Sequence, residues 1–427
     1  MKVSVNTVSG CSREVHVEVP AEAVQSKVDV IYGRISREAK LPGFRKGKAP
    51  LAAIKKQYKE AVREEILHHE LPEFFRTALV DQKIDPVAQP QISHLQFEEG
   101  APLKFVATVE IKPEFQLKDY KGIKVRKEKT LVNEEELDKA LDGLREQLAQ
   151  FIPVEDRPSK ADDLVVVDFD GKIDGKPFEG GKASRYPVLL GSGGLLKDFE
   201  SNLTGVKREE TKTFKIAFPQ DYGKKEVAGH EAEFTVTVHE IKEKKLPVID
   251  NDFAKDVGKC ETVKELREKL ETQIKANKEV EQRSKMVEQI GDKLLALHPF
   301  DVPVSLVNVE QQRLVQQGVD RLKRQGIDAN KLTEDQKREF VEKLRPVAQK
   351  NVQMALIVEK ISEVENIHSD DKDLDAYYAK VAQSSNQPLD VVKRYLKQQE
   401  NTESIKEWIR YEKTLDFLIA QAKVETA

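Results

Sequence analysis

Residues 165–178 read VVVDFDGKIDGKPF, and this segment sets the fold of the central region of the chain. Val165, Val167 and Phe169 alternate with other residues, which is the pattern of a β-strand with one buried face. The dipeptide Asp174-Gly175 favours the tight turn of a β-hairpin, because both of its residues tolerate a left-handed backbone. The segment therefore predicts two antiparallel strands joined at Asp174-Gly175.

The region around this segment, residues 151–246, has the composition of a small β domain. It holds seven of the chain's 17 Phe and ten of its 21 Gly, which are typical core and turn residues of β structure. Two further alternating segments follow, Phe214-Ile216-Phe218 and Phe234-Val236-Val238. We expect a small antiparallel sheet lined with aromatic side chains.

The first 112 residues combine the periodicities of strands and helices. Residues 3–19 alternate as strands do, and residues 24–35 and 51–79 carry apolar side chains at helical spacing. Alternation returns at residues 103–111. An α+β domain over residues 1–112 is the expected fold.

Residues 113–150 predict a structured linker that contains one helix. Asn133 is followed three residues later by Glu136, which is the arrangement of a helix capping box. An apolar stripe follows it and must be covered by another helical region, because Pro153 soon ends the helix. The stripe consists of Leu137, Leu141, Leu144 and Leu148.

The rest of the chain, residues 247–427, predicts an all-α domain. Only four Gly remain, and apolar stripes recur at helical spacing between runs of Lys, Glu and Gln. We expect a break at residues 298–303, helix starts near Thr333 and Ser369, and a final amphipathic helix that carries Trp408. The stripes of such helices either meet in a closed bundle or leave an open, partly apolar surface.

Charge and cysteine content limit the classes of function. The 427 residues include 71 basic and 75 acidic ones, so no global field draws the chain onto nucleic acid or anionic lipid. Cys11 and Cys260 are the only thiols and form no metal-ligand or redox pattern, which favours a reducing compartment. With no apolar signal segment or membrane span in the sequence, we expect a cytoplasmic protein.

The segment Leu41-Pro-Gly-Phe-Arg-Lys-Gly-Lys-Ala-Pro50 is a cationic loop between two helical segments. Its Pro-Gly pair and Gly47 favour chain reversals, and Pro50 suits the start of the next helix. Phe44, Arg45, Lys46 and Lys48 are thereby placed at a tip. Such a tip suits an anionic partner with an apolar surface, as ribonucleoprotein has, although the Phe can also fold back onto its own helices.

No motif of nucleotide binding, metal binding or hydrolysis is present, so we expect no cofactor and no metal. The aromatic region suits one reaction that needs little more than a dry cleft, the rotation of an X-Pro bond. Its barrier of about 20 kcal/mol reflects amide resonance. An apolar cleft with one or two backbone donors favours the twisted amide over the planar one. The same aromatic residues also suit a plain core.

Five segments in order resemble the FK506-binding-type prolyl isomerase domain: VDFDG at 167–171, DGKPFEGG at 174–181, LGSG at 190–193, LLKDFE at 195–200 and FPQDY at 218–222. The resemblance implies an isomerase pocket with its catalytic residues at matching positions. These are Phe169, Phe178, Tyr186, Leu195, Leu196, Phe199, Tyr222 and Phe234.

The loop GFRKGKAP at 43–50 resembles the ribosome-docking signature of the bacterial trigger factor family, and the order of the regions matches that family over the whole chain. The resemblance implies docking on a large-subunit protein beside the exit tunnel, and helical arms that shelter unfolded nascent polypeptides without ATP. It also implies a free form that can dimerise. The ribosome-binding residues would be Gly43, Phe44, Arg45, Lys46, Gly47 and Pro50.

The chain departs from the family pattern at two places. Lys197-Asp198 stands where Pro-Gly is common, and Arg208-Glu209 where Ala-Gly is common. Asp198 in place of glycine removes backbone freedom beside the pocket and can shift the donor at Leu196. We expect the fold to be kept and the rate of turnover to be affected.

Two rival functions remain open at this point. A dedicated prolyl isomerase with substrate-recruiting flanking domains would be indifferent to ribosomes. An RNA-binding regulator would use the cationic loop and bind naked RNA with a steep salt dependence. The balanced net charge argues against the second rival, and no sequence-specific contact with nucleic acid and no contact with a membrane is expected.

Overall fold

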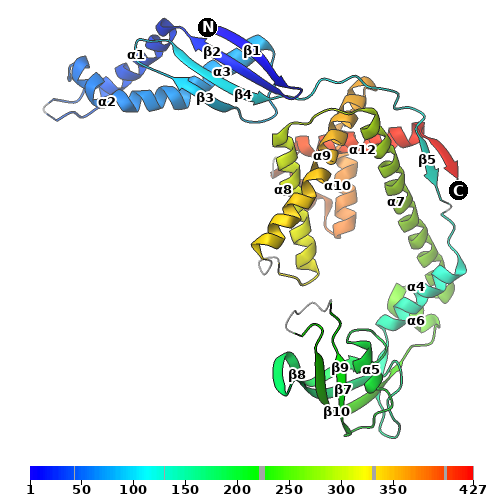
Figure 1. The fold of residues 1–427 in the computed structure, drawn as a ribbon. Helices are drawn as coiled ribbons and strands as arrows, with labels where there is room; N and C mark the ends of the chain where they lie inside the picture. Colours follow the sequence, from blue (N-terminus) through cyan, green and yellow to red (C-terminus); the bar gives the residue numbers. More distant parts are fainter. Residues whose placement is uncertain (43, 129, 221–226, 329–332, 399–401, 427) are drawn as a thin grey trace. The chain divides into compact units, whose positions relative to one another are not determined.

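The computed structural model describes residues 1–42, 44–128, 130–220, 227–328, 333–398 and 402–426. The chain divides into two compact units (Figure 1). One unit joins Met1–Glu128 with Arg283–Ala427, and the other is Lys129–Gln282. Each unit is described below by itself.

The first unit begins with a four-stranded antiparallel sheet of order β1-β2-β4-β3. Alternation in β2 and β4 puts one face of the sheet against the helices, where Val17 and Phe105 are almost fully buried. This is the predicted α+β domain. Its elements are β1 (Lys2–Ser9), β2 (Ser12–Val19), α1 (Ala21–Glu38), α2 (Leu51–Glu65), a π-helical turn (Ile66–Glu70), α3 (Leu71–Gln82), β3 (Gln91–Gln96) and β4 (Leu103–Glu110).

The remainder of the first unit is mainly helical, as predicted for residues 247–427, except that one short strand near the end of that region was predicted as part of an all-α domain. Apolar faces of α7, α9 and α12 enclose a core that includes Leu294, Ile357 and Leu418. β5 (Lys124–Lys127) and β11 (Lys423–Thr426) form a two-stranded parallel sheet, a pairing that no sequence pattern predicted. The helices are the part of α7 (Val263–Leu297) from Arg283 onward, α8 (Val304–Arg324), α9 (Glu334–Val364), α10 (Asp371–Ser385), α11 (Leu389–Gln398) and α12 (Thr402–Gln421).

Helix boundaries in this region follow the sequence signals. The predicted break at residues 298–303 separates α7 from α8, and Thr333 caps α9 in a capping box with Gln336. The cap of α10 is Asp370, one residue beyond the predicted Ser369, because its carboxylate accepts a hydrogen bond from the Asp373 N–H. In the part of the chain that the structure describes, no helix is long and apolar enough to span a membrane.

The second unit contains an antiparallel sheet of order β6-β10-β7-β8, with β9 also paired to β10. The predicted hairpin is confirmed, since β7 and β8 meet at Asp174-Gly175 and both residues have positive φ, 50° and 78°. The elements are α4 (Glu134–Gln147), β6 (Gln150–Pro153), β7 (Leu164–Ile173), β8 (Lys176–Leu189), α5 (Lys197–Asn202), β9 (Thr211–Ala217), β10 (Glu231–Lys245) and α6 (Asn251–Gly258).

The predicted linker helix is α4, and its capping box between Asn133 and Glu136 is present. Its stripe packs on α6 and the start of α7, where Leu141 meets Phe253 and Leu266 in a buried cluster. The prediction is wrong for Leu148, which is 40% exposed. The helix ends at Gln147, so the next side chain leaves the stripe.

Candidate functional site

An aromatic pocket of about 370 Å³ opens in the second unit between the sheet and α5. Six of the residues predicted for an isomerase site line it: Phe169, Phe178, Leu195, Leu196, Phe199 and Phe234. The remaining lining residues were not predicted as site residues. They are Glu179, Gly180, Gly193, Gly194, Ile216, Phe218 and Val227.

Neighbouring strands and α5 bring the rings of the pocket together edge to face. Phe199 lies with its ring centroid 5.7 Å from that of Phe169 and 5.4 Å from that of Phe234. Phe178 lies 6.1 Å from Phe234 at an interplanar angle of 89°. Such T-shaped pairs are favourable beyond their burial, and here they hold four rings around one cavity.

Two glycines make room for these rings. Gly171 on β7 is paired with Phe234 on β10, and a Cβ at position 171 would lie 2.4 Å from Phe234 Cε1. A Cβ at Gly181 would lie 2.9 Å from both Gly171 O and Phe178 Cε1. The rings can occupy their places because no side chain is present at either position.

The corner before α5 supplies a backbone donor. Leu196 caps the helix, and its carbonyl accepts hydrogen bonds from Phe199 N at 2.8 Å and Glu200 N at 3.2 Å. Within the described residues, the N–H of Leu196 itself has no acceptor. A half-buried, unpaired donor at the edge of an apolar pocket suits the carbonyl oxygen of a bound peptide.

The two departures from the family pattern differ in their structural effect. Asp198 lies in the first turn of α5 with helical backbone, so position 198 does not need glycine. An acidic residue there also interacts favourably with the helix start. Glu209 has φ of 64°, a left-handed conformation that strains a residue with a side chain.

Of the two predicted tyrosines, Tyr186 is described by the structure and is not among the residues that line the pocket. Tyr186 is 42% exposed and contacts the edge of Phe169, with 5.9 Å between the ring centroids. Tyr222 lies outside the described residues.

A polar network next to Phe169 joins strands β7, β8 and β10. Asp168 Oδ1 accepts a hydrogen bond from Arg185 N at 2.7 Å, and its Oδ2 lies 2.9 Å from His239 Nε2. These two contacts, the backbone hydrogen bond first, lower the pKa of Asp168. Arg185 has φ of 48°, so the carboxylate fixes an irregular point of β8 just before Tyr186.

The cationic loop of the first unit is built from two successive turns. Phe44 N donates to Leu41 O at 3.1 Å, and Lys48 N donates to Arg45 O at 2.9 Å. Gly47 has φ of 75°, which favours glycine, and Pro50 is the N-cap of α2. Gly43 lies outside the described residues.

The tip of this loop is exposed. Phe44 is 45% exposed and does not belong to the core of its domain, whereas Leu41 and Ala49 at the two ends of the loop pack against that core. Arg45 and Lys46 are also exposed. The loop is therefore anchored at both ends and presents a ring and three cations, Arg45, Lys46 and Lys48, to solvent.

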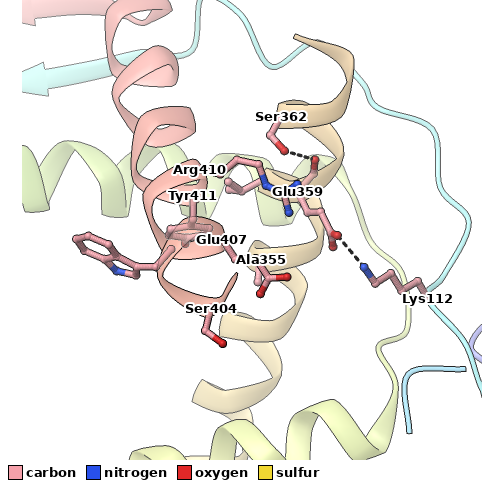
Figure 2. A pocket seen from close by; sticks show the side chains of 10 residues that line it. Lys112, Ala355, Glu359, Ser362, Ser404, Glu407, Arg410 and Tyr411 are labelled. Carbon is pink, nitrogen blue, oxygen red and sulfur yellow. Dashed lines mark hydrogen bonds and ion pairs between the residues drawn. The ribbon is translucent and has the colours of Figure 1, made fainter. Parts of the chain in front are cut away.

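A second pocket of about 370 Å³ lies between α9 and α12 of the first unit (Figure 2). Lys112 Nζ lies 2.7 Å from Glu359 Oε1 at its edge, and Trp408 in its wall is 49% exposed. The sequence predicts an amphipathic helix around Trp408, but no sequence signal indicates a pocket there. The described residues contain no cluster of His, Cys, Asp and Glu suited to a metal ion.

Three family models match the chain. They are the bacterial trigger factor protein over residues 1–144, the FKBP-type peptidyl-prolyl cis-trans isomerase over residues 155–239, and the bacterial trigger factor C-terminus over residues 262–420.

Curated proteins match over nearly the full length. The trigger factor of Carboxydothermus hydrogenoformans is 36% identical over 99% of this chain and 100% of its own length. The trigger factor of Alkaliphilus oremlandii is 37% identical over 96% of this chain and 97% of its own length. A solved structure of the trigger factor chaperone, 22% identical, covers 98% of this chain and 99% of its own with a TM-score of 0.51, so the two share a fold.

Proposed function

This chain belongs to the bacterial trigger factor family of ribosome-associated chaperones that carry an FKBP-type peptidyl-prolyl isomerase domain, and on that premise we propose a site for each activity. Its partners are ribosomes and nascent polypeptides. The rival function of a dedicated isomerase with no ribosome contact is not favoured, since the matches cover the N- and C-terminal regions as well as the isomerase domain.

The proposed ribosome contact is the cationic loop, with Phe44, Arg45 and Lys46 in the interface and Gly43, Gly47 and Pro50 shaping the turns. The observation that supports it most is the exposure of the Phe44 ring, since an exposed phenyl group contributes little to folding. Arg45 and Lys46 add attraction to an anionic surface. The partner surface would lie on the large subunit near the exit of the tunnel.

The proposed isomerase site is the aromatic pocket. Phe169, Phe178, Leu195, Leu196, Phe199 and Phe234 would enclose the proline ring, with Tyr186 and Tyr222 at the rim. Rotation of an X-Pro bond removes amide resonance, so a dry pocket favours the less polar, twisted amide over the planar one. The free N–H of Leu196 would bind the carbonyl oxygen that turns out of conjugation.

The domain organisation proposed for these activities follows the sequence. Residues 1–112 form the ribosome-binding domain, residues 113–150 a structured linker, residues 151–246 the isomerase domain and residues 247–427 the client-binding domain. The helical domain would shelter nascent chains at the tunnel exit without ATP. We place the protein in the cytoplasm and expect the free form to associate as a homodimer.

Co-sedimentation with ribosomes tests the docking proposal. Replacement of Phe44, Arg45 and Lys46 by Ala removes the ring and two cations without changing the turns, and should abolish pelleting of the protein. A matched control replaces three exposed residues elsewhere in the same domain by Ala. These are two cations, Lys56 and Arg76, and one apolar residue, Val80. Unchanged pelleting of the loop variant would refute the assignment, whereas loss only in the loop variant would support it.

A further inference from the structure

Glu200 on α5 is a buried carboxylate, only 7% exposed. Its Oε2 accepts hydrogen bonds from Gly191 N at 2.9 Å and Gly193 N at 3.4 Å, and its Oε1 accepts one from Leu195 N at 3.2 Å. Within the described chain, no cation pairs with this carboxylate. Three backbone N–H groups of one loop therefore offset the free energy of burying it.

The loop from Gly191 to Leu195 owes its shape to this contact. Gly191 and Gly193 have φ of 89° and 67°, left-handed conformations that turn successive N–H groups toward one point. In sequence, the segment has the composition of an ordinary glycine-rich loop. The buried carboxylate at its centre explains why several of its N–H groups converge.

The same loop forms one wall of the aromatic pocket. Gly193, Leu195 and Leu196 all line it. Glu200 binds the N–H of Leu195, and the next N–H along the chain, that of Leu196, has no acceptor among the described residues. The carbonyl of Leu196 is held from the other side by the N–H groups of Phe199 and Glu200.

We propose that Glu200 is a positioning residue for prolyl isomerisation. Its carboxylate holds the Gly191–Leu195 loop so that the N–H of Leu196 stays fixed at the edge of the pocket. This inference rests on the proposed use of the pocket. It assigns Glu200 no contact with the substrate and no proton transfer.

The test compares Glu200→Gln and Glu200→Ala with Asp198→Asn in the full chain, using a proline-containing peptide and no coupled protease. Gln keeps one acceptor oxygen but adds an NH₂ group that faces N–H donors, and Ala removes the acceptor entirely. Asp198 is an exposed carboxylate on the same helix for which the described residues show only a backbone contact, to Asn202.

The expected result is a loss of kcat/KM by roughly tenfold for Gln and more for Ala, with the change mainly in kcat, because a displaced donor weakens binding of the twisted amide. Asp198→Asn should stay within twofold of the parent. The ¹⁵N amide signals of Gly191, Gly193, Leu195 and Leu196 should move in both Glu200 variants and remain in place in Asp198→Asn.

A second control separates positioning from general loss of stability. Ser159 is buried in the same domain and bridges Leu203 O and Val206 N, away from the pocket lining. Ser159→Ala should lower the melting temperature and leave kcat/KM of the folded protein unchanged. Equal loss of kcat/KM in Ser159→Ala, or unchanged kcat and amide signals in Glu200→Ala, would overturn the positioning role.

Failure of the underlying function is distinguishable. If the parent protein gave no turnover and the peptide moved no amide signal of the pocket, the use of the pocket would be refuted, and the role of Glu200 with it. Turnover in the parent together with normal kcat in both Glu200 variants would refute only the role of Glu200.

Discussion

Gly171 on β7 and Phe234 on β10 are paired across the sheet, and the Phe234 ring occupies the space that a side chain at position 171 would need. The ring is also the common neighbour of Phe169, Phe178 and Phe199. The back wall of the pocket therefore depends on the absence of one methyl group.

Gly171→Ala should destabilise the isomerase domain by about 1–3 kcal/mol, because the new Cβ forces the Phe234 ring out of its packed position. Peptide isomerisation should fall with it. Urea denaturation and the proline-peptide assay measure the two effects. Gly143→Ala on α4 is the control: a Cβ there meets nothing within 4 Å, and the helix should gain stability. Parent-like stability and parent-like peptide isomerisation in Gly171→Ala would contradict this explanation.

Phe178→Ala tests whether the pocket binds proline or is only a core. Phe178 is half-buried on β8 and contacts Phe218 and Phe234. Removing its ring should lower kcat/KM for a proline peptide by roughly tenfold, since part of the apolar wall is lost. Chemical denaturation at the assay temperature must show that the variant is folded under the conditions of the assay. Parent-like kcat/KM would show that the aromatic cluster only packs.

Glu209→Gly should stabilise the protein by roughly 0.5–1 kcal/mol, because glycine adopts φ of 64° without strain. The greater conformational freedom of glycine in the unfolded chain offsets only part of this stabilisation. The neighbouring variant Glu210→Gly should do the opposite. Glu210 Oε2 accepts a hydrogen bond from Lys207 N at 2.8 Å, which glycine cannot provide. Denaturant midpoints of the two variants that shift in the same direction would refute this explanation.

Asp163 predicts an acid-sensitive contribution to stability. The residue is 2% exposed, and this burial raises its pKa. Hydrogen bonds from the Arg157 guanidinium and from Lys160 N outweigh the effect of burial and leave the pKa below its usual range. Because the folded-state pKa is the lower one, the contribution is complete above the unfolded pKa of about 3.9 and is lost as the pH falls through the folded value.

Asp163→Asn should therefore lower the free energy of unfolding by roughly 2 kcal/mol at pH 7, and the difference from the parent should shrink below about pH 4. Asp162→Asn is the control, because Asp162 is exposed with φ of 66°, a conformation that Asn tolerates. Urea denaturation at several pH values provides the test. A difference between Asp163→Asn and the parent that does not depend on pH would count against the charge as its cause.

Local signals predicted much of the fold. Asp174-Gly175 specified the hairpin, and Asn133 with Glu136 specified the start of α4, because turns and caps are made by residues close in sequence. The pairing of β5 with β11 was not predicted, because it joins residues about 300 positions apart and each strand has only four residues.

The lining of the pocket was predicted only in part, and from family resemblance instead of local sequence signals. Phe169 and Phe199 were identified by resemblance, whereas Ile216 was missed because an alternating apolar residue reads the same whether it lines a pocket or fills a core. Val227 was missed because it lies in a turn, outside any alternating segment. Glu200 was missed as well, since a carboxylate on a short helix normally faces solvent. Its burial depends on a loop that folds around it.

The most direct test of the central claim is photocrosslinking from a benzophenone amino acid at position 44, which keeps an aromatic ring at the tip of the loop. A matched probe replaces Val30, which is 69% exposed on α1. With stalled ribosomes, the account predicts a crosslink from position 44 to a large-subunit protein near the tunnel exit and none from position 30. No ribosomal crosslink from position 44, or equal crosslinks from both positions, would contradict it.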